Sequence, residues 1–299
     1  MDKKELLLSV SPNILLTGAT GFLGSHLLEA LLEKGCKVII LKRSTSNPWR
    51  ILHLLDQVSS YDIDKQPLEL AFEQKNIDVA IHAAGQYGRG DCSISKIIEA
   101  NVIFGVNLMD ACLRHNVKTF INTDTMLLPY LNNYSLSKKQ FVEWLKQYSD
   151  RIQVVNLRLD HMYGVKDDDN KFVAWVLSQL KENTQEIKLT LGEQKRDFIY
   201  IDDVVSAFMI VMDKRRGLPQ FSEFDVGTGR LVSVRKFVER MVFHCKKTNP
   251  KLQTKLLFGA VPCRKGEAMS VAVDATGLNE IGWQSKIELD EGINKIIKE

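Results

Sequence analysis

Short apolar runs alternate along the chain with longer stretches in which apolar residues recur at helical spacing. An apolar run of about four to eight residues predicts a buried strand, whereas recurrence every three to four residues predicts an amphipathic helix. By these criteria we expect strands at residues 15–17, 36–41, 78–85, 117–125 and 153–159, and helices at residues 25–34, 68–73, 94–115 and 134–147. Strands that alternate with helices at this spacing predict an α/β fold with a doubly wound parallel sheet.

The regular alternation gives way to shorter elements near residue 160. We therefore expect a Rossmann-like, dinucleotide-binding domain over residues 1–160. Residues 161–299 are expected to form mainly a smaller α/β lobe for the substrate, with some segments that return to the first domain. The chain contains no internal repeat, low-complexity tract or linker between the two parts. A charged stretch at residues 166–170 is expected to be a solvated loop.

Three glycines at positions i, i+3 and i+6 separate the first predicted strand from its helix. This arrangement brings unpaired backbone N–H groups and the positive end of the helix dipole to one point, which suits a pyrophosphate. A glycine turn without a ligand is the alternative, but the strand before it and the helix and strand after it favour a dinucleotide site. The residues expected to contact the cofactor here are Gly18, Thr20, Gly21, Phe22, Leu23 and Gly24, joined by the small residues Ala83 and Ala84 of a later strand.

Basic residues follow the second strand, about 20 residues past the glycines, where an acidic residue would select NAD by binding its ribose 2′-hydroxyl. The sequence has Lys42 and Arg43 there, followed by Ser44 and Thr45. Two cations and two hydroxyls suit a 2′-phosphate, so the sequence favours NADPH or NADP over NAD. A solvated basic turn is the alternative.

Composition narrows the class of protein. The chain has 299 residues, of which 44% are hydrophobic and 26% charged, and a net charge of +3, so nothing in it calls for a nucleic acid or a membrane as partner. No apolar run approaches the ~18 residues of a membrane span, and the first residues lack the apolar core of a signal peptide. The five cysteines show no metal-like spacing. We expect reduced thiols, no metal site and a cytoplasmic location.

Tyr134 and Lys138 stand four residues apart at the start of a predicted helix. Residues at this spacing share one helix face, so both side chains can point into the same cleft. An ammonium group beside a phenol favours the phenolate, so we expect Lys138 to lower the pKa of Tyr134 and make it a usable acid or base. The preceding strand ends with Thr123 and Thr125, either of which could hold a substrate carbonyl oxygen.

Several motifs in the same order resemble the extended short-chain dehydrogenase/reductases, the superfamily of nucleotide-sugar epimerases, dehydratases and reductases. These motifs occupy residues 17–24, 82–84, 101–102, 134–138, 158–164, 196–204, 225–229 and 281–283. The resemblance implies that Tyr134 and Lys138 are catalytic, that Lys138 also holds the nicotinamide ribose, and that Asn101 steadies Lys138 through a water molecule. It further implies a homodimer formed by the helices at 94–115 and 134–147.

Within this superfamily the chain is similar to CDP-abequose synthases and related reductases of 4-keto-6-deoxy-sugar nucleotides, in residues 122–125, 161–164 and 193–198. That similarity implies NADPH-dependent reduction of the C4 keto group of a CDP- or dTDP-linked 4-keto-6-deoxyhexose in deoxysugar biosynthesis. Dehydratases of the family follow the strand-end threonine with an Asp-Glu pair, and Thr125 stands here in place of the glutamate. A nucleotide-sugar 4-epimerase with tightly bound NAD and a non-catalytic dinucleotide-sensing protein are the alternatives.

The resemblance also assigns residues to the nucleotide-sugar substrate. Arg196 and Arg264 match arginines that hold the substrate diphosphate in the family, and a guanidinium group suits bidentate phosphate contacts. The alternatives are an ion pair of Arg196 with Asp197 or Asp202, and a solvated loop around Arg264. The residues expected to contact the substrate are Thr123, Asp124, Tyr134, His161, Arg196 and Arg264.

Overall fold

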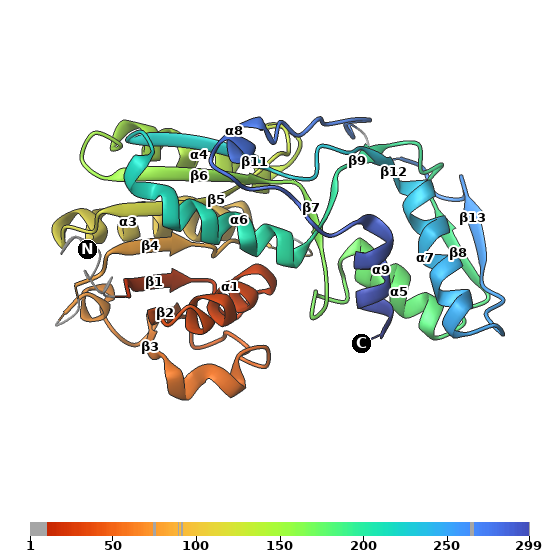
Figure 1. Ribbon diagram of the computed structural model, residues 1–299, viewed down its shortest axis with the longest axis horizontal. Coiled ribbons are helices and arrows are strands. Elements are labelled where there is room, and N and C mark those ends of the chain that lie inside the picture. The colour runs from red at the N-terminus through yellow and green to blue at the C-terminus, as the bar shows by residue number, and fades with distance from the viewer. Residues whose placement is uncertain (1–10, 74–75, 89, 91, 264–265, 299) are drawn as a thin grey trace, which may run out of the picture.

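A seven-stranded parallel sheet forms the centre of the protein in a computed structural model that describes residues 11–73, 76–88, 90, 92–263 and 266–298 (Figure 1). In spatial order its strands are β3 (Ser59–Asp62), β2 (Lys37–Lys42), β1 (Asn13–Thr17), β4 (Val79–His82), β5 (Thr119–Thr125), β6 (Gln153–Leu159) and β11 (Phe221–Val226). Every neighbouring pair is parallel. The chain winds outwards from β1 to β3 and then, from β4, outwards in the opposite direction. The predicted doubly wound α/β fold is confirmed.

Helices cover both faces of this sheet. One face carries α1 (Phe22–Glu33) and α6 (Ile201–Lys214), and the other carries α3 (Phe104–Arg114) and α4 (Asn133–Gln147). Successive side chains of a strand point to opposite faces, so Ile14 and Leu16 of β1 join the core under the first helix pair and Leu15 joins the core under the second. Burial on both faces is the reason why these strands read as near-continuous apolar runs.

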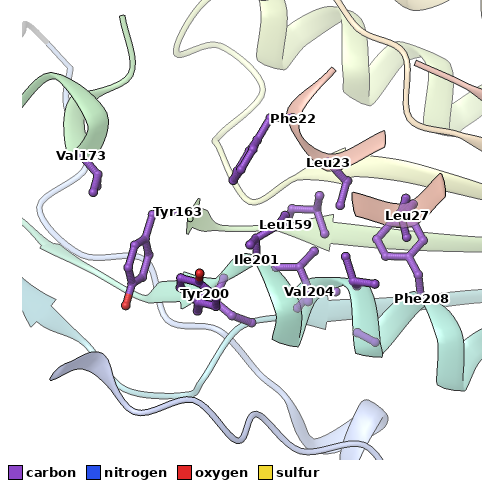
Figure 2. Close-up of a cluster of buried hydrophobic side chains, with 14 of the residues drawn as sticks. Phe22, Leu23, Leu27, Leu159, Tyr163, Val173, Tyr200, Ile201, Val204 and Phe208 are labelled. Carbon is purple, nitrogen blue, oxygen red and sulfur yellow. The ribbon is translucent and has the colours of Figure 1, made fainter. Parts of the chain in front are cut away.

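The core under α1 and α6 continues into the second half of the chain (Figure 2). Leu27 of α1 and Phe208 of α6 are buried within it. Tyr163 and Val173, which follow β6 along the chain, belong to the same apolar cluster. Apolar contacts therefore fix the second half of the chain to one face of the sheet.

The second half builds a smaller group of helices and short strands beside the sheet, on the right of Figure 1. Two of its segments, α6 and β11, return to the sheet, where β11 pairs with β6. Three two-stranded pairs form elsewhere, β7 with β10, β8 with β13 and β9 with β12, in which the strands are β7 (His161–Tyr163), β8 (Glu186–Leu189), β9 (Lys195–Arg196), β10 (Phe198–Tyr200), β12 (Val232–Ser233) and β13 (Lys255–Phe258). Besides α6, the described part of this half contains the helices α5 (Phe172–Lys181), α7 (Val234–Thr248), α8 (Thr276–Glu280) and α9 (Leu289–Lys298) and the 3₁₀ turn η4 (Arg215–Gly217).

Three segments differ from the sequence-based prediction. The helix expected at residues 94–115 is divided into α2 (Ile94–Ile98), a π-helical turn η3 (Glu99–Ile103) and α3. The helix expected at residues 68–73 is only a 3₁₀ turn, η2 (Leu68–Ala71), and a further 3₁₀ turn η1 (Leu52–Gln57) precedes β3. The strand β3 itself was not predicted, because its sequence Ser-Ser-Tyr-Asp lacks the apolar pattern of a strand buried on both faces.

Candidate active site

The glycine turn after β1 is shaped by close backbone contacts that leave no room for side chains. Gly18 has a φ of +73°, and a Cβ atom there would lie 2.6 Å from the amide nitrogen of Ala84. A Cβ atom on Gly24 would lie 2.0 Å from the carbonyl oxygen of Gly18. Gly21 caps α1 without any side-chain hydrogen bond to the first turn. The backbone N–H groups at the start of α1, which no side chain caps, and the tightly packed turn fit the pyrophosphate of a dinucleotide.

Thr17 and His82 join the ends of β1 and β4, the two strands at which the sheet changes direction. The Thr17 hydroxyl lies 2.8 Å from Nδ1 of His82 and accepts a hydrogen bond of 3.2 Å from the backbone N–H of Ala84. His82 is fully buried, and burial, assisted by the charge of Lys138, lowers its pKa to about 3. The imidazole is therefore neutral, and it holds the strand end in place beside the glycine turn.

The basic turn after β2 lies next to two aspartates that sequence reasoning missed. Nζ of Lys42 is 3.8 Å from the carboxylate of Asp62, at the end of β3. The Ser44 hydroxyl donates to Asp62 at 2.8 Å, and the Ser44 backbone N–H donates to Asp64 at 2.9 Å. Arg43 beside them is exposed. The register of β2 with β3, which places Lys42 opposite Asp62, could have revealed this contact only if β3 had been recognised.

A buried arginine, also missed from sequence, ties the glycine turn to the segment after β7. The Arg50 guanidinium donates to the carbonyl oxygens of Lys166 at 2.8 Å and Thr20 at 3.3 Å, and it pairs with Asp168 at 2.7 Å. Burial raises the pKa of the neighbouring Asp167 carboxyl to about 6. Residues 166–170 form the expected loop, and residues 168–170 are exposed, whereas Lys166 and Asp167 are half-buried. Arg50 ties this loop to the glycine turn, which the sequence did not predict.

The first turns of α4 bring Tyr134 and Lys138 to the end of β5. Asn132 caps the helix, since its side chain accepts from the Ser135 backbone N–H while the Ser135 hydroxyl accepts from the Asn132 backbone N–H. The ammonium of Lys139 donates to the Thr125 carbonyl oxygen at 2.6 Å and so binds α4 to the strand end. Lys138 is almost completely buried, and none of the hydrogen bonds or ion pairs found among the described residues involves its ammonium group.

The pKa values of the two residues both reflect burial. The pKa of Tyr134 is raised well above its ordinary value of 10 by burial first, and then by Tyr87 and by the negative charge of Asp124. The expected lowering of the Tyr134 pKa is therefore not found in this structure, because burial disfavours the charged phenolate and raises the pKa. The pKa of Lys138 falls to about 8 because of burial, although Asp124 acts in the opposite direction. Tyr134 is a neutral phenol at physiological pH and a potential proton donor.

Asn101 joins the loop after β4 to α4 from the π-helical turn η3. Its amide nitrogen donates to the Gln86 carbonyl oxygen and to the Ser137 hydroxyl, both at 2.9 Å. Its amide oxygen accepts from the Gln86 backbone N–H at 2.7 Å. The residue next to Lys138 and the loop that follows β4 are therefore held by one buried side chain, and such π-helical turns recur at functional sites.

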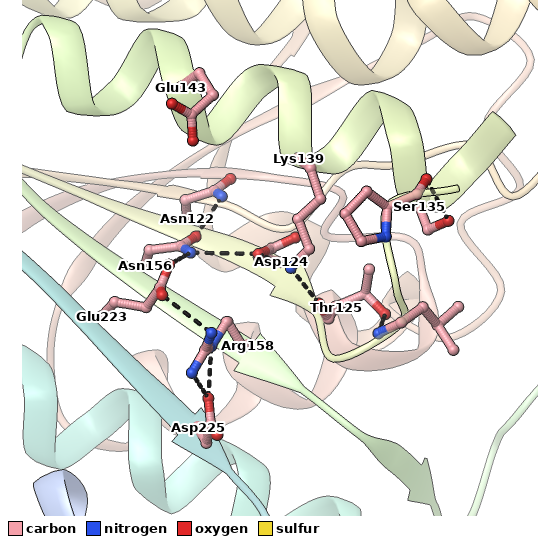
Figure 3. A network of polar contacts seen from close by, with 12 residues as sticks. Asn122, Asp124, Thr125, Ser135, Lys139, Glu143, Asn156, Arg158, Glu223 and Asp225 are labelled. Carbon is pink, nitrogen blue, oxygen red and sulfur yellow. Dashed lines mark hydrogen bonds and ion pairs between the residues drawn. The ribbon is translucent and has the colours of Figure 1, made fainter. Parts of the chain in front are cut away.

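The end of β5 presents its polar side chains in two directions. Thr123 and Thr125 are both buried and share one side of the strand, where the Thr123 hydroxyl donates to the His82 carbonyl oxygen at 3.0 Å and the Thr125 hydroxyl accepts from the Leu127 backbone N–H at 3.2 Å. Asp124 points the other way, into an ion pair of 2.6 Å with Lys139 (Figure 3). The structure does not group Asp124 with the two threonines.

Asp124 belongs to a polar network that crosses three adjacent strands (Figure 3). The amide nitrogen of Asn156 on β6 donates to Asp124 at 3.4 Å and to Glu223 on β11 at 2.7 Å. Beside it, Arg158 pairs with Asp225 at 2.5 Å and with Glu223 at 3.1 Å. The carboxylate of Asp124 is therefore a structural partner of β6 and α4 through Oδ2.

The residues assigned to the substrate diphosphate are only partly described. Arg196 on β9 is buried and pairs with Glu267 at 2.8 Å, so its partner is neither Asp197 nor Asp202, the two that the sequence suggested. Arg264 lies outside the described residues. His161 is more than one-third exposed, and its Nδ1 lies 2.7 Å from the carboxylate of Asp160. The partly exposed histidine therefore lies on β7 and the paired arginine on β9, both in the second half of the chain.

Two kinds of feature are absent from the part of the chain that the structure describes. No three or more His, Cys, Asp or Glu side chains gather there as a metal ion would require. No helix in the same residues has both the length and the apolar character needed to cross a bilayer.

Comparisons with known proteins agree with this geometry. The family model described as the NAD dependent epimerase/dehydratase family matches residues 14–227. CDP-abequose synthase of Salmonella muenchen is 33% identical to this chain, and the match covers 97% of this chain and 99% of the synthase. A putative UDP-glucose 4-epimerase of Methanocaldococcus jannaschii is 24% identical, with 95% of this chain and 97% of that protein covered. The crystal structure of UDP-glucose 4-epimerase from Thermotoga maritima with UDP-glucose is similar at a TM-score of 0.83, with 24% identity and coverage of 96% and 97%. The chain belongs to the NAD dependent epimerase/dehydratase family.

Proposed function

We propose that this protein reduces the C4 keto group of a CDP- or dTDP-linked 4-keto-6-deoxyhexose, with NADPH as the reductant. The observation that carries the proposal is the pair formed by half-buried Tyr134 and buried Lys138, four residues apart on α4. The helix follows a strand end that carries the hydroxyls of Thr123 and Thr125. Full-length similarity to CDP-abequose synthase supports a nucleotide-linked deoxysugar as the substrate.

The cofactor would be held by the glycine turn and by the strand ends around it. The absence of side chains at Gly18 and Gly24 leaves space for the cofactor, and the start of α1 supplies the backbone N–H groups that would bind its pyrophosphate. The small side chains of Ala83 and Ala84 allow the cofactor to approach the backbone closely. A reduced nicotinamide, when bound, supplies the hydride for C4. The exposed guanidinium of Arg43 supports a preference for a 2′-phosphate, whereas Lys42 must loosen its contact of 3.8 Å with Asp62 to join it.

The residues of the chain would manage the charge that develops on the substrate oxygen. Thr123 or Thr125 orients the carbonyl group, and Tyr134 donates its proton to the forming alkoxide. A neutral phenol suits this role, because the raised pKa keeps the proton on Tyr134 until a strongly basic oxygen forms beside it. Arg196, Arg264 and His161 are proposed to bind the diphosphate and the sugar, for which Arg196 would exchange Glu267 for phosphate.

Specific observations bear on the other reactions of the family. Dehydration would need acidic groups after the strand-end threonine, but Asp124 is paired with Lys139 and the next residue is Thr125. Similarity to a putative UDP-glucose 4-epimerase keeps epimerisation with tightly bound NAD as the second candidate. A non-catalytic dinucleotide sensor would have no need for a buried lysine beside Tyr134. The described cysteines are all free thiols, which accords with the reducing cytoplasm as the proposed location.

The first test identifies the dinucleotide that co-purifies and then follows NADPH absorbance with CDP- and dTDP-4-keto-6-deoxyglucose. Rapid NADPH oxidation with exchangeable NADP supports the proposed reduction, and the better substrate names the nucleotide. Stoichiometric NAD without net oxidation would establish the epimerase instead. A stable protein partner without turnover on any keto sugar would favour the sensor.

A substitution of the proton donor tests the catalytic assignment. Tyr134→Phe should lower kcat by about 10²- to 10⁴-fold, because the phenyl ring lacks the proton for the alkoxide, while the affinity for NADPH remains. Tyr130→Phe is the matched control, since the Tyr130 side chain is 88% exposed. Turnover of Tyr134→Phe at the wild-type rate would show that Tyr134 is not the acid.

A further inference from the structure

Tyr87, on the loop that follows β4, lies directly against Tyr134. The two ring centroids are 4.6 Å apart at an interplanar angle of 32°, so the two side chains are in direct contact. Tyr87 is 43% exposed, so it connects Tyr134 with the solvent. The ammonium of Lys171 lies 3.4 Å from the centroid of the Tyr87 ring. Neither Tyr87 nor Lys171 belongs to the motifs that identify the family.

A reductase has a requirement that an epimerase lacks. Each reduction removes one proton from Tyr134 for good, because the proton leaves in the product hydroxyl. An epimerase returns the proton to its tyrosine in the second half of its own cycle. An enzyme that carries out the proposed reduction must therefore protonate the Tyr134 phenolate again in every turnover.

We propose that the Tyr87 hydroxyl relays a proton from the solvent to Tyr134 after each reduction. The inference rests on the proposed function. Addition of the hydride breaks the C4–O π bond, and the resulting alkoxide takes the proton of Tyr134. The Tyr134 phenolate then takes the proton of the Tyr87 hydroxyl, and the Tyr87 phenolate takes a proton from solvent water. Tyr87 acts through Tyr134 and is thus a positioning residue rather than a catalytic one.

The charges around the two rings favour this direction of transfer. The negative charge of Asp124, at the end of β5, disfavours a phenolate on Tyr134. Lys171, over the face of the Tyr87 ring, stabilises a transient phenolate on Tyr87. Lys138, on the helix that carries Tyr134, acts in the opposite direction, because a cation near Tyr134 favours its phenolate. A negative charge left on Tyr134 is therefore better placed on Tyr87, from which the solvent removes it.

The loop that carries Tyr87 is held in position for this contact. Asn101 forms hydrogen bonds with both the N–H and the carbonyl oxygen of Gln86, the residue before Tyr87. The same Asn101 side chain reaches Ser137 on α4, the helix that carries Tyr134. One buried amide thus fixes the spacing between the two tyrosines.

The test compares wild-type protein with Tyr87→Phe, which keeps the ring stack and removes the hydroxyl. We expect kcat to fall by about tenfold or more with KM little changed, because substrate still binds but Tyr134 is reloaded slowly. Increasing concentrations of imidazole buffer should restore kcat of the variant, since a small acid can deliver the missing proton, and should leave the wild type unchanged. Tyr130→Phe, at an exposed tyrosine, should behave as the wild type in both respects.

A second measurement needs no turnover. Contact with Tyr87 raises the pKa of Tyr134, so the tyrosinate titration of Tyr134, followed by nuclear magnetic resonance of labelled tyrosine, should move to lower pH in Tyr87→Phe. An unchanged titration would show that the two side chains are not coupled.

The outcomes separate the relay from the proposed function. Wild-type protein that oxidises no NADPH with either 4-keto sugar overturns the reduction and, with it, the relay. Normal wild-type turnover together with a Tyr87→Phe variant of wild-type kcat and no response to imidazole overturns the relay alone. A variant that changes only KM would assign Tyr87 to substrate binding and also overturn the relay.

Discussion

Function and stability oppose each other at Lys138. Its ammonium group is almost completely buried at the start of α4, where desolvation lowers its pKa to about 8. A lowered pKa means that the folded protein is less stable with the charge than without it. The sequence requires a lysine four residues after Tyr134 for the proposed chemistry, and the fold tolerates the cost of burying it.

Replacement of Lys138 should therefore stabilise the protein while abolishing turnover. Between pH 8 and 10.5 the unfolded chain holds a proton that folded Lys138 has lost, so the contribution of this residue to stability rises with pH in that window. Below pH 8 the penalty is complete and amounts to roughly 3 kcal/mol. In urea unfolding at pH 7, the free energy of unfolding of Lys138→Met should exceed that of the wild type by up to that amount. The difference should shrink towards pH 10.5.

Lys236→Met is the control for this comparison. Lys236 is exposed on α7, so its replacement should change the free energy of unfolding by less than about 0.5 kcal/mol at either pH. A Lys138→Met variant that is no more stable than the wild type at pH 7 would contradict the burial of a charged ammonium group.

Among the elements, the glycine turn is the most tightly constrained connection to the proposed cofactor site. A Cβ atom on Gly24 would lie 2.0 Å from the Gly18 carbonyl oxygen, so Gly24→Ala must push α1 away from the turn. We expect a loss of about 1–3 kcal/mol in the free energy of unfolding, as for other overpacked sites, together with weaker dinucleotide binding measured by calorimetry. Gly217→Ala, which meets no atom within 4 Å, should change neither quantity. If both variants bound the dinucleotide with equal affinity, the glycine turn would not be part of the cofactor site.

The elements that the sequence predicted are those with strong local signals. Apolar strands such as β6, the start of α1 after the glycines, and the placement of Tyr134 and Lys138 on one helix follow from spacing alone. The polar strand β3 was missed, and with it the contact between Lys42 and Asp62. No local pattern marks β3 as a strand, because its identity depends on pairing with β2.

Contacts between distant segments account for the other differences. Arg50 contacts the carbonyl oxygen of Lys166, 116 positions later, and Tyr87 stacks on Tyr134 from another loop. The raised pKa of Tyr134 likewise depends on burial and on neighbours that only the fold assembles. Spacing along the chain predicts which residues share an element, but it contains no information on what later packs against them.

At the scale of the whole molecule, an apolar surface remains on the side of the sheet opposite α1 and α6. A groove between α3 and α4 is lined in part by Val106, Met109 and Tyr148, and the Trp144 side chain beside them is 49% exposed. Ile94 of α2 is 60% exposed. Exposed apolar groups gathered in this way are typical of a surface that another protein covers.

We propose that a second copy of the chain covers this surface, as the resemblance to the superfamily implies for the helices at 94–115 and 134–147. A carboxylate placed on Trp144 would then be buried in the dimer interface, so Trp144→Glu should dissociate the protein into monomers. Sedimentation velocity at micromolar concentration should show a dimer for the wild type and about half that mass for the variant. Phe243→Glu, at a side chain 58% exposed on α7 of the other half, should remain dimeric. A monomeric wild type would contradict the proposal, and a Trp144→Glu variant that stays dimeric would locate the interface on another face.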